Sequence, residues 1–191
     1  MPTNALSAPV LGIFAGGRGL RMGGRDKAQL PSPITGEPLQ ARLLRLGQQQ
    51  GLTCVIVGGA AMDGTVVLAD EPAGIGPIGG LCALLAFAAA RPAIALACDL
   101  PYLDEALLAR LATMRSDAAV LSPRDPATGK WQPLFARYDS PRVLPALRVA
   151  IAEGVRSFQT FLRTLEVAEP ALSDAEHALL RDWDHPADMQ G

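Results

Sequence analysis

The chain has 191 residues, of which 49% are hydrophobic and 19% are charged. This length and composition predict a well-buried globular protein and exclude an intrinsically disordered one. The net charge of −2 argues against binding through bulk positive charge, so we expect no nucleic-acid partner.

No stretch of the sequence predicts secretion or membrane insertion. The first ten residues, MPTNALSAPV, contain no charged side chain and no long apolar run, so they do not resemble a secretory signal. The longest apolar segment, residues 81–90, is too short to cross a bilayer. We therefore expect a cytoplasmic protein with no membrane partner.

Apolar strands alternate with amphipathic helices over the first two thirds of the chain. We expect strands at Val10–Phe14, Leu52–Val57, Thr65–Ala69, Ala93–Ala97 and Ala118–Leu121, and helices at Pro38–Gln50, Gly79–Arg91 and Asp104–Arg115, the last of them capped by Asp104. Because the strands are apolar throughout, they predict a mainly parallel sheet that is covered on both faces. The expected fold is a three-layer α/β/α, Rossmann-like architecture.

The pattern changes after about Ser122. A polar loop is followed by an expected strand at Trp131–Tyr138 and by helices near Pro141–Glu153 and Val155–Leu165. We interpret residues 1–191 as a single domain, in which about 10–121 form the alternating strand–helix part and about 122–191 form a C-terminal elaboration.

The segment Ala15–Lys27, AGGRGLRMGGRDK, combines five glycines with three arginines and a lysine directly after the first strand. Ligands of open parallel sheets bind at the carboxyl ends of the strands. Glycines there let backbone N–H groups approach an anion and the basic side chains supply charge, so we expect a phosphate-binding loop.

Two common phosphate loops do not fit this segment. The dinucleotide fingerprint G-x-G-x-x-G fails because Met22 stands at its last position. A Walker A loop requires glycine, lysine and then serine or threonine, whereas Lys27 follows Asp26 and precedes Ala28.

The segment resembles the L-A-G-G/A-x-G/S-x-R-M-G…K signature of the sugar-nucleotide-type nucleotidyltransferases, with Phe14 in place of the leading leucine. Its RMGGRDK portion is most similar to the molybdenum cofactor guanylyltransferases, which transfer GMP from GTP to molybdopterin. The resemblance implies a nucleotidyltransferase fold and triphosphate contacts from residues that lie in register with the signature, namely Phe14, Ala15, Gly16, Gly17, Arg21 and Lys27.

Two further segments are similar to motifs of the same family. Asp70 and the following GIGPIGGL resemble its D…GPLAGL segment, which implies guanosine contacts from Asp70, Gly76, Pro77 and Gly79. The segment ACDLPYL resembles its C-D-x-P-Y motif, which makes Asp99 the expected Mg²⁺ ligand. A carboxylate at the end of a buried strand suits that ion, which prefers oxygen ligands and bridges to phosphates.

The C-terminal third carries weaker similarities. The segments GKWQPLFARY and GVRSF resemble regions that shape the pterin side, which makes Gln132, Arg156 and Ser157 candidates for molybdopterin contacts. Trp131 suits either stacking on a flat ring or partial burial in the core. The segment DWDHPADM resembles N-x-N-T-P-E-D, and Asp184 replaces an asparagine as a candidate second Mg²⁺ ligand.

The implied reaction is an in-line attack by the terminal phosphate of molybdopterin on the α-phosphorus of GTP, with release of pyrophosphate. We expect Arg21, Lys27 and Asp99 to be the catalytic residues, because the reaction rests on positioning and charge neutralisation. The expected partners are GTP and molybdopterin, and the resemblance also allows cofactor-delivery and insertion proteins.

Other functions stay open at this point. Cytidylyl transfer to the same pterin and nucleotidyl transfer to a sugar phosphate are alternatives within the enzyme class. A catalytically decayed nucleotide-binding protein is the alternative outside it. An NAD-dependent oxidoreductase is a more distant option, since the fingerprint fails at Met22.

Overall fold

The computed structural model describes residues 8–16, 27–62 and 64–183. Its strands are β1 (Val10–Phe14), β2 (Thr53–Val57), β3 (Val66–Leu68), β4 (Ala93–Ala97), β5 (Val120–Leu121), β6 (Phe135–Tyr138) and β7 (Val167–Ala168). Its helices are α1 (Leu39–Gln49), α2 (Pro77–Ala88), α3 (Glu105–Thr113), α4 (Ser140–Ala152), α5 (Phe158–Leu162) and α6 (Asp174–Leu179), together with a short 3-10 helix, η2 (Lys27–Gln29).

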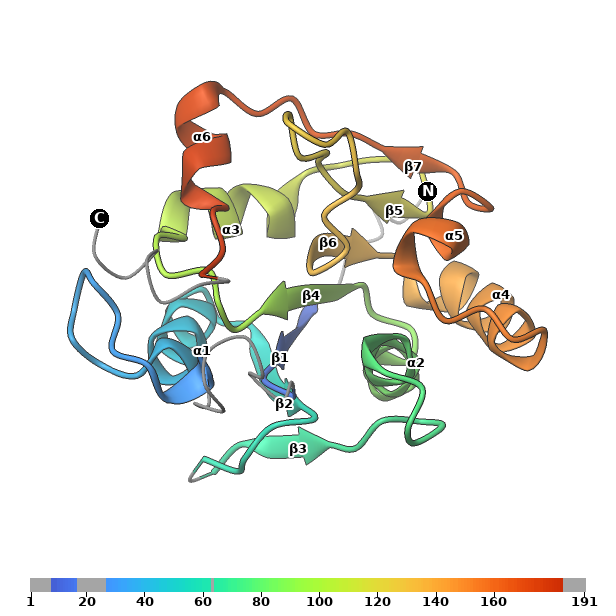
Figure 1. The fold of residues 1–191 in the computed structure, drawn as a ribbon, viewed down its shortest axis with the longest axis horizontal. Helices are drawn as coiled ribbons and strands as arrows, with labels where there is room; N and C mark the ends of the chain where they lie inside the picture. Colours follow the sequence, from blue (N-terminus) through green and yellow to red (C-terminus); the bar gives the residue numbers. More distant parts are fainter. Residues whose placement is uncertain (1–7, 17–26, 63, 184–191) are drawn as a thin grey trace, which may run out of the picture.

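The strands form one seven-stranded sheet in the order β3-β2-β1-β4-β6-β5-β7 (Figure 1). β1 lies at its centre and pairs in parallel with β2 and with β4, and β2 pairs in parallel with β3. The expected mainly parallel sheet is therefore confirmed, with β6 as the antiparallel strand between β4 and β5.

Helices cover both faces of this sheet, which gives a three-layer α/β/α fold. Figure 1 shows α1 and α3 on one side and α2, α4 and α5 on the other. Two separate clusters of buried side chains correspond to these two layers. Because β1, β2 and β4 are packed on both faces, their sequences are continuously apolar rather than alternating.

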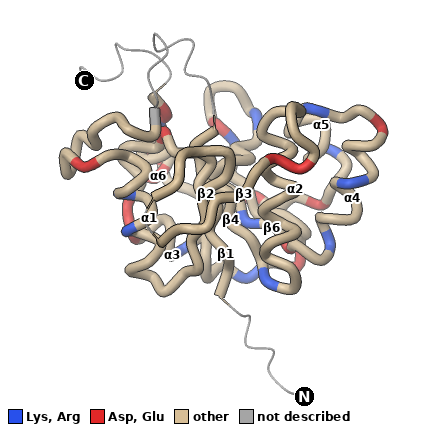
Figure 2. Tube along the Cα trace, turned by 90° about the horizontal axis from the view of Figure 1, so that it is seen from below, with Lys and Arg blue, Asp and Glu red and all other residues tan. Residues whose placement is uncertain are grey.

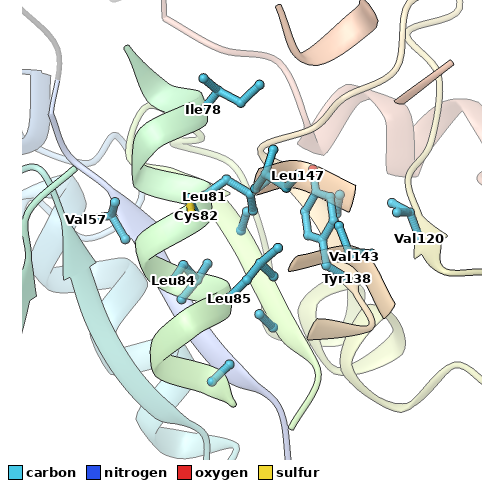
Figure 3. Close-up of a cluster of buried hydrophobic side chains, with 14 of the residues drawn as sticks. Val57, Ile78, Leu81, Cys82, Leu84, Leu85, Val120, Tyr138, Val143 and Leu147 are labelled. Carbon is cyan, nitrogen blue, oxygen red and sulfur yellow. The ribbon is translucent and has the colours of Figure 1, made fainter. Parts of the chain in front are cut away.

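The α2 layer holds the larger of the two clusters. Figure 3 shows Leu81 and Leu85 pointing from α2 toward Tyr138 of β6 and Val143 of α4. Helix α2 sits close to the sheet because β1 offers no side chain there: a Cβ on Gly12 would lie 2.6 Å from a methyl carbon of Leu84. The side chain of Leu84 on α2 thus packs directly on the backbone of Gly12 in the central strand.

Most expected elements are confirmed, and some bounds differ. Helix α2 begins at Pro77 rather than Gly79, because proline suits the first turn of a helix, where its missing N–H costs nothing. It ends at Ala88 rather than Arg91, since Ala89 adopts a positive φ of 55° and closes the helix. The expected cap of α3 is confirmed, with Asp104 accepting the N–H of Leu107 at 2.8 Å.

The expected strand Trp131–Tyr138 is wrong over its first half, since β6 begins at Phe135. The backbone of Gln132 bonds instead to Pro123 and to the Ser122 hydroxyl, and Pro133 has no N–H for a ladder. The expected helix Val155–Leu165 is shorter as well, because Ser157 caps it at its N-terminus and it runs over Phe158–Leu162.

Acidic and basic residues are interspersed along the described chain in Figure 2. In the same view the described chain begins at the bottom, below β1, and its last residues lie at the top. Within the described ranges, no helix is long and apolar enough to cross a membrane.

We predict that Leu84→Ala lowers the free energy of unfolding by about 2–5 kcal/mol, because it opens a cavity between α2 and the central strand. Leu84 is 0% exposed, whereas Val149 on α4 is 58% exposed and provides the matched control as Val149→Ala. Thermal unfolding should show a loss on the order of 10 °C for Leu84→Ala and a change within about 2 °C for the control. Equal midpoints for the two variants would contradict this account of the core.

Candidate functional site

Three parallel strands end level with one another at the carboxyl edge of the sheet. Phe14 of β1 stands opposite Val57 of β2 and Ala97 of β4. The chain segments that follow these strands therefore emerge side by side, and the N–H of Cys98 donates to the carbonyl of Phe14 at 3.1 Å. This edge brings Ala15 and Gly16, the described start of the expected phosphate loop, close to the segment that carries the expected metal ligand, Asp99.

The start of the glycine-rich loop is held against the end of β2. The N–H groups of Ala15 and Gly16 both donate to the carbonyl of Val57, at 3.1 and 3.3 Å. A Cβ on Gly16 would lie 2.6 Å from the carbonyl oxygen of Gly58, which is backbone and has no rotamer to give way. Glycine is therefore required at position 16, independently of any ligand.

Asp70 lies close to the first turns of α2. The N-cap of that helix is Gly76, whose φ of 76° favours glycine, and Pro77 follows as the first helical residue. A Cβ on Gly80 would lie 3.1 Å from Oδ1 of Asp70, so the carboxylate packs directly against the helix. Gly79 likewise lies against backbone, since its Cβ would be 2.6 Å from the Pro72 carbonyl.

Phe14, which the resemblance also makes a nucleotide contact, lies in the core of the protein. Its side chain is buried in the core, and its Cε1 would lie 3.0 Å from a Cβ on Gly80. Phe14 therefore packs against α2 at Gly80 and helps to hold that helix on β1.

Asp99 follows β4 and is half-buried. Its carbonyl accepts the N–H of Trp183 at 3.2 Å. The Trp183 side chain is buried with Leu30 and Leu39, and its ring meets Tyr102 edge-on at 6.4 Å between centroids. The last described residues of the chain are thus anchored beside the carboxyl end of β4.

A cavity of about 940 Å³ opens beside Asp99. Its walls come from the end of β4, from the loop between β5 and β6, and from α6. The polar residues that line it are Asp99, Asp125, Thr128, Lys130, Gln132, Gln159, Asp174, His177, Arg181 and Asp182, and Trp131 contributes an aromatic side chain.

The loop before β6 is fixed by hydrogen bonds at several points. The Gln132 carbonyl accepts the Ser122 hydroxyl at 3.0 Å, and the Pro133 carbonyl accepts the Tyr138 hydroxyl at 2.8 Å. The N–H of Ala97 donates to the Leu134 carbonyl at 2.7 Å, which ties the loop to the end of β4. These bonds place Gln132, an expected pterin contact, in the wall of the cavity.

Arg156 and Ser157 do not line this cavity. Arg156 donates through Nη1 to the carbonyls of Ile151 and Val155, at 2.9 and 2.8 Å, and so caps the end of α4. Ser157 is the N-cap of α5 and accepts the N–H of Thr160 at 3.4 Å. Both residues have structural roles here, and their contact with molybdopterin stays a prediction.

Several expected site residues lie outside the described residues, namely Gly17, Arg21 and Asp184. Lys27 is the first residue of η2, directly before the buried Ala28. Its segment contacts α1, which lies on the same face of the sheet as α3.

The sequence also matches a known protein family. A family model described as a MobA-like NTP transferase domain matches residues 11–168. The chain belongs to this family.

Curated relatives extend the match over almost the whole chain. A molybdenum cofactor guanylyltransferase of Pseudomonas putida is 35% identical over 188 residues, covering 94% of each chain. A probable molybdenum cofactor guanylyltransferase of Opitutus terrae is 33% identical and covers 98% of this chain and 96% of its own. The chain is therefore a nucleotidyltransferase of the MobA-like family.

Solved structures support the same fold. Molybdopterin-guanine dinucleotide biosynthesis protein A of Archaeoglobus fulgidus superposes with a TM-score of 0.75, at 20% identity and 94% coverage of each chain. A 2-C-methyl-D-erythritol 4-phosphate cytidylyltransferase of Thermus thermophilus gives 0.70, at 16% identity and 96% coverage of each chain. The nucleotidyltransferase fold is thus shared by enzymes with different acceptors.

The donor set at Asp99 suits a divalent ion that shares its ligands with a substrate. Among the described residues there is no group of three or more His, Cys, Asp or Glu side chains that could hold a metal unaided. Mg²⁺ in nucleotide-dependent enzymes typically takes one or two carboxylates and completes its shell with phosphates and water. Asp99 and Asp182 line the same cavity and supply carboxylates of that kind.

Sequence reasoning missed two residues of this cavity. Asp182 lines the cavity, and the resemblance of DWD to N-x-N could have identified it, because it occupies the first asparagine position. His177 also lines the cavity, and its Nδ1 is buried with no hydrogen-bond partner among the described residues. No sequence motif includes His177. Its helix, α6, is short and has no buried residues, so no apolar pattern predicts it either.

Helix α6 forms one wall of the cavity and is held mainly by polar contacts. None of its residues is buried, and Ser173 and Glu176 form a capping box at its start. Glu176 accepts the N–H of Ser173 at 2.8 Å and pairs with Arg110 of α3. The Ser173 hydrogen bonds and the Arg110 guanidinium together lower the pKa of Glu176 to about 2.

We predict that Glu176→Gln loosens α6 without unfolding the sheet. Because the folded-state pKa is depressed from 4.5 to about 2, the carboxylate stabilises α6 above pH 4.5 and loses this effect as the pH falls through that window. Hydrogen exchange at neutral pH should increase over residues 172–181 and stay unchanged in β1 and β4. Glu153→Gln at the exposed end of α4 is the control, and equal exchange in the two variants would refute the role of Glu176.

Proposed function

We propose that this enzyme transfers GMP from GTP to the terminal phosphate of molybdopterin and releases pyrophosphate. The observation that carries the proposal is the shared sheet edge, where the turn at Gly16, the carboxylate of Asp99 and the 940 Å³ cavity lie side by side. The 35% identity to a guanylyltransferase along 94% of the chain supports guanine as the base and molybdopterin as the acceptor.

The nucleotide is proposed to bind on the β1 and α2 side of this edge. We propose that the backbone N–H of Gly17 donates to the triphosphate. The N–H of Gly16 is already bonded to the Val57 carbonyl, so Gly16 contributes the tight turn, and Phe14 and Ala15 hold the start of that loop in place. Asp70, Gly76, Pro77 and Gly79 are proposed to meet the guanosine. The close packing of Asp70 against α2 supports this placement, since it fixes the carboxylate beside the helix N-terminus.

The transfer itself requires no general base. The attacking terminal phosphate is already an anion near neutral pH, so the enzyme has to align it with the α-phosphorus of GTP and neutralise charge. We assign the neutralisation to Arg21 and Lys27. Pyrophosphate leaves with the electron pair of the broken P–O bond as the new phosphoanhydride forms.

Asp99 is proposed to hold Mg²⁺, with Asp184 as a second ligand. When bound, the ion would screen the phosphate charges and polarise the α-phosphate. The half-buried position of Asp99, with its carbonyl fixed by Trp183, gives its carboxylate a defined location at the edge. Asp182, in the same cavity wall, is an additional carboxylate for this role.

The acceptor is proposed to occupy the cavity on the β6 and α6 side, with Gln132 in its wall. Arg156 and Ser157 are also proposed to contact the pterin, from outside the lining of this cavity. We also propose that the reaction takes place in the cytoplasm and that delivery and insertion proteins bring and collect the cofactor.

We predict that Lys27→Ala and Asp99→Asn each reduce GMP transfer by at least about a hundredfold, because each removes a charge that the reacting phosphates require. The measurement is GTP-dependent pyrophosphate release with molybdopterin as the acceptor. The controls are Arg163→Ala and Asp117→Asn, which change the same charges at exposed positions away from the edge. Turnover near the wild-type rate in either test variant, with the fold intact, would refute the assignment of that residue.

We predict that Mg²⁺ with GTP raises the unfolding temperature by about 5–10 °C at a hundred times the dissociation constant, which corresponds to about 2.7 kcal/mol. CTP, UTP and ATP at the same concentration should give little shift, and Lys27→Ala should weaken the response to GTP. A larger shift with CTP would instead assign the enzyme to cytidylyl transfer by the same mechanism.

A further inference from the structure

Trp131 is held in the wall of the cavity by its backbone. The carboxamide of Gln159, from α5, accepts the N–H of Trp131 at 3.1 Å through Oε1 and donates to its carbonyl at 2.7 Å through Nε2. One side chain thus satisfies both backbone groups of Trp131, as a neighbouring strand would. The position of this residue is therefore set by a helix that is distant in sequence.

The indole ring is held as well. The guanidinium carbon of Arg124 lies 3.5 Å from the centroid of the Trp131 ring, which is a close cation–π contact. Arg124 is itself fixed, because Nη1 donates to the Gly129 carbonyl at 2.7 Å and Nε lies 3.5 Å from Oε2 of Glu169. Trp131 lines the cavity and Arg124 does not, and the partly buried indole also packs against the core cluster of the α2 layer.

Polar groups line the same cavity as Trp131. Asp125 accepts the hydroxyl and the N–H of Thr128, at 2.8 and 2.7 Å, and these bonds hold its pKa below the ordinary value. His177 contributes a buried Nδ1 that has no partner among the described residues. Lys130 and Gln132 add a cation and an amide to the lining.

An ordered aromatic ring with hydrogen-bonding groups beside it suits a particular class of ligand. A flat heterocycle gains dispersion and quadrupole interactions by stacking on indole, and its ring nitrogens and exocyclic groups need polar partners at the edge. An acyclic phosphate would gain nothing from the ring. Because Gln159 and Arg124 fix Trp131 in advance, the ligand does not bear the entropy cost of ordering it.

We propose that Trp131 is a stacking platform for a flat fused-ring heterocycle of the acceptor, and that it determines which acceptor the enzyme accepts. This inference rests on the proposed function, since it assumes that the cavity beside Asp99 receives the acceptor. The chemical class is a bicyclic, polar, aromatic ring such as a pterin. Sugar phosphates lack such a ring and bind poorly to this wall.

The test compares Trp131→Leu with Trp131→Phe, which keeps an aromatic face. Phe87→Leu is the matched control, because Phe87 is an exposed aromatic residue of α2 that does not line the cavity. The first readout is the dissociation constant of 6-hydroxymethylpterin, measured by calorimetry. The second is the separate KM for molybdopterin and for GTP, together with kcat.

We expect Trp131→Leu to weaken pterin binding and to raise the KM for molybdopterin by about tenfold, with the KM for GTP unchanged. For Trp131→Phe, the pterin dissociation constant and the KM for molybdopterin should stay within about threefold of the wild-type values. For Phe87→Leu, both should equal the wild-type values. Unchanged pterin affinity in Trp131→Leu would overturn the inference. So would an equal rise in the KM for both substrates with a lower unfolding temperature, because that pattern indicates a packing role.

The two proposals fail in different ways. If the wild type transfers GMP to molybdopterin and Trp131→Leu has a normal KM for it, the platform is refuted and the proposed function stands. If the wild type transfers no GMP to molybdopterin, the proposed function is refuted. Direct binding of the pterin probe to the wild type and to Trp131→Leu then still decides whether Trp131 is a platform.

Discussion

The level ends of β2, β1 and β4 are the constraint on which the site depends. Parallel pairing in this register makes three chain segments leave the sheet at the same height, so backbone pairing alone brings Gly16, Gly58 and the segment with Asp99 close together. The approach is close enough that a Cβ on Gly16 would lie 2.6 Å from the Gly58 carbonyl. A slip of one residue between β1 and β4 would shift Gly16 relative to Asp99 and would turn the side chains of the slipped strand toward the opposite helix layer.

The antiparallel strand β6 completes the site from the other direction. Because β6 runs against β4, Phe135 at its start stands opposite Leu96 near the end of β4. The loop before β6 must therefore lie at the carboxyl edge, beside Asp99. A parallel strand would need a crossover of a dozen or more residues, usually a helix, and would deliver that loop to the opposite edge. The reversal of one strand thus converts a nucleotide-binding edge into an edge with two sides.

The strand ends that carry Gly16 and Asp99 could be predicted from the sequence, because their signals are local. An apolar run followed by glycines and basic residues identifies the end of β1, and an aspartate after an apolar run identifies the end of β4. The acceptor half could not be predicted in the same way. Gln159, Arg124 and Glu169 hold Trp131 through contacts between distant segments, and no periodicity records such contacts. Helix α6 is short and has no buried residues, so its sequence lacks the apolar stripe that reveals longer helices.

The two sides of this edge also differ in what makes them rigid. On the nucleotide side, backbone packs against backbone at Gly16 and Gly79, so the surface is set by the sheet itself and leaves little room for variation. On the acceptor side, side-chain hydrogen bonds and ion pairs hold a loop and a short helix in place. Such contacts are replaced one at a time at modest cost in stability. The sheet edge at Gly16 can therefore stay the same while the cavity wall changes.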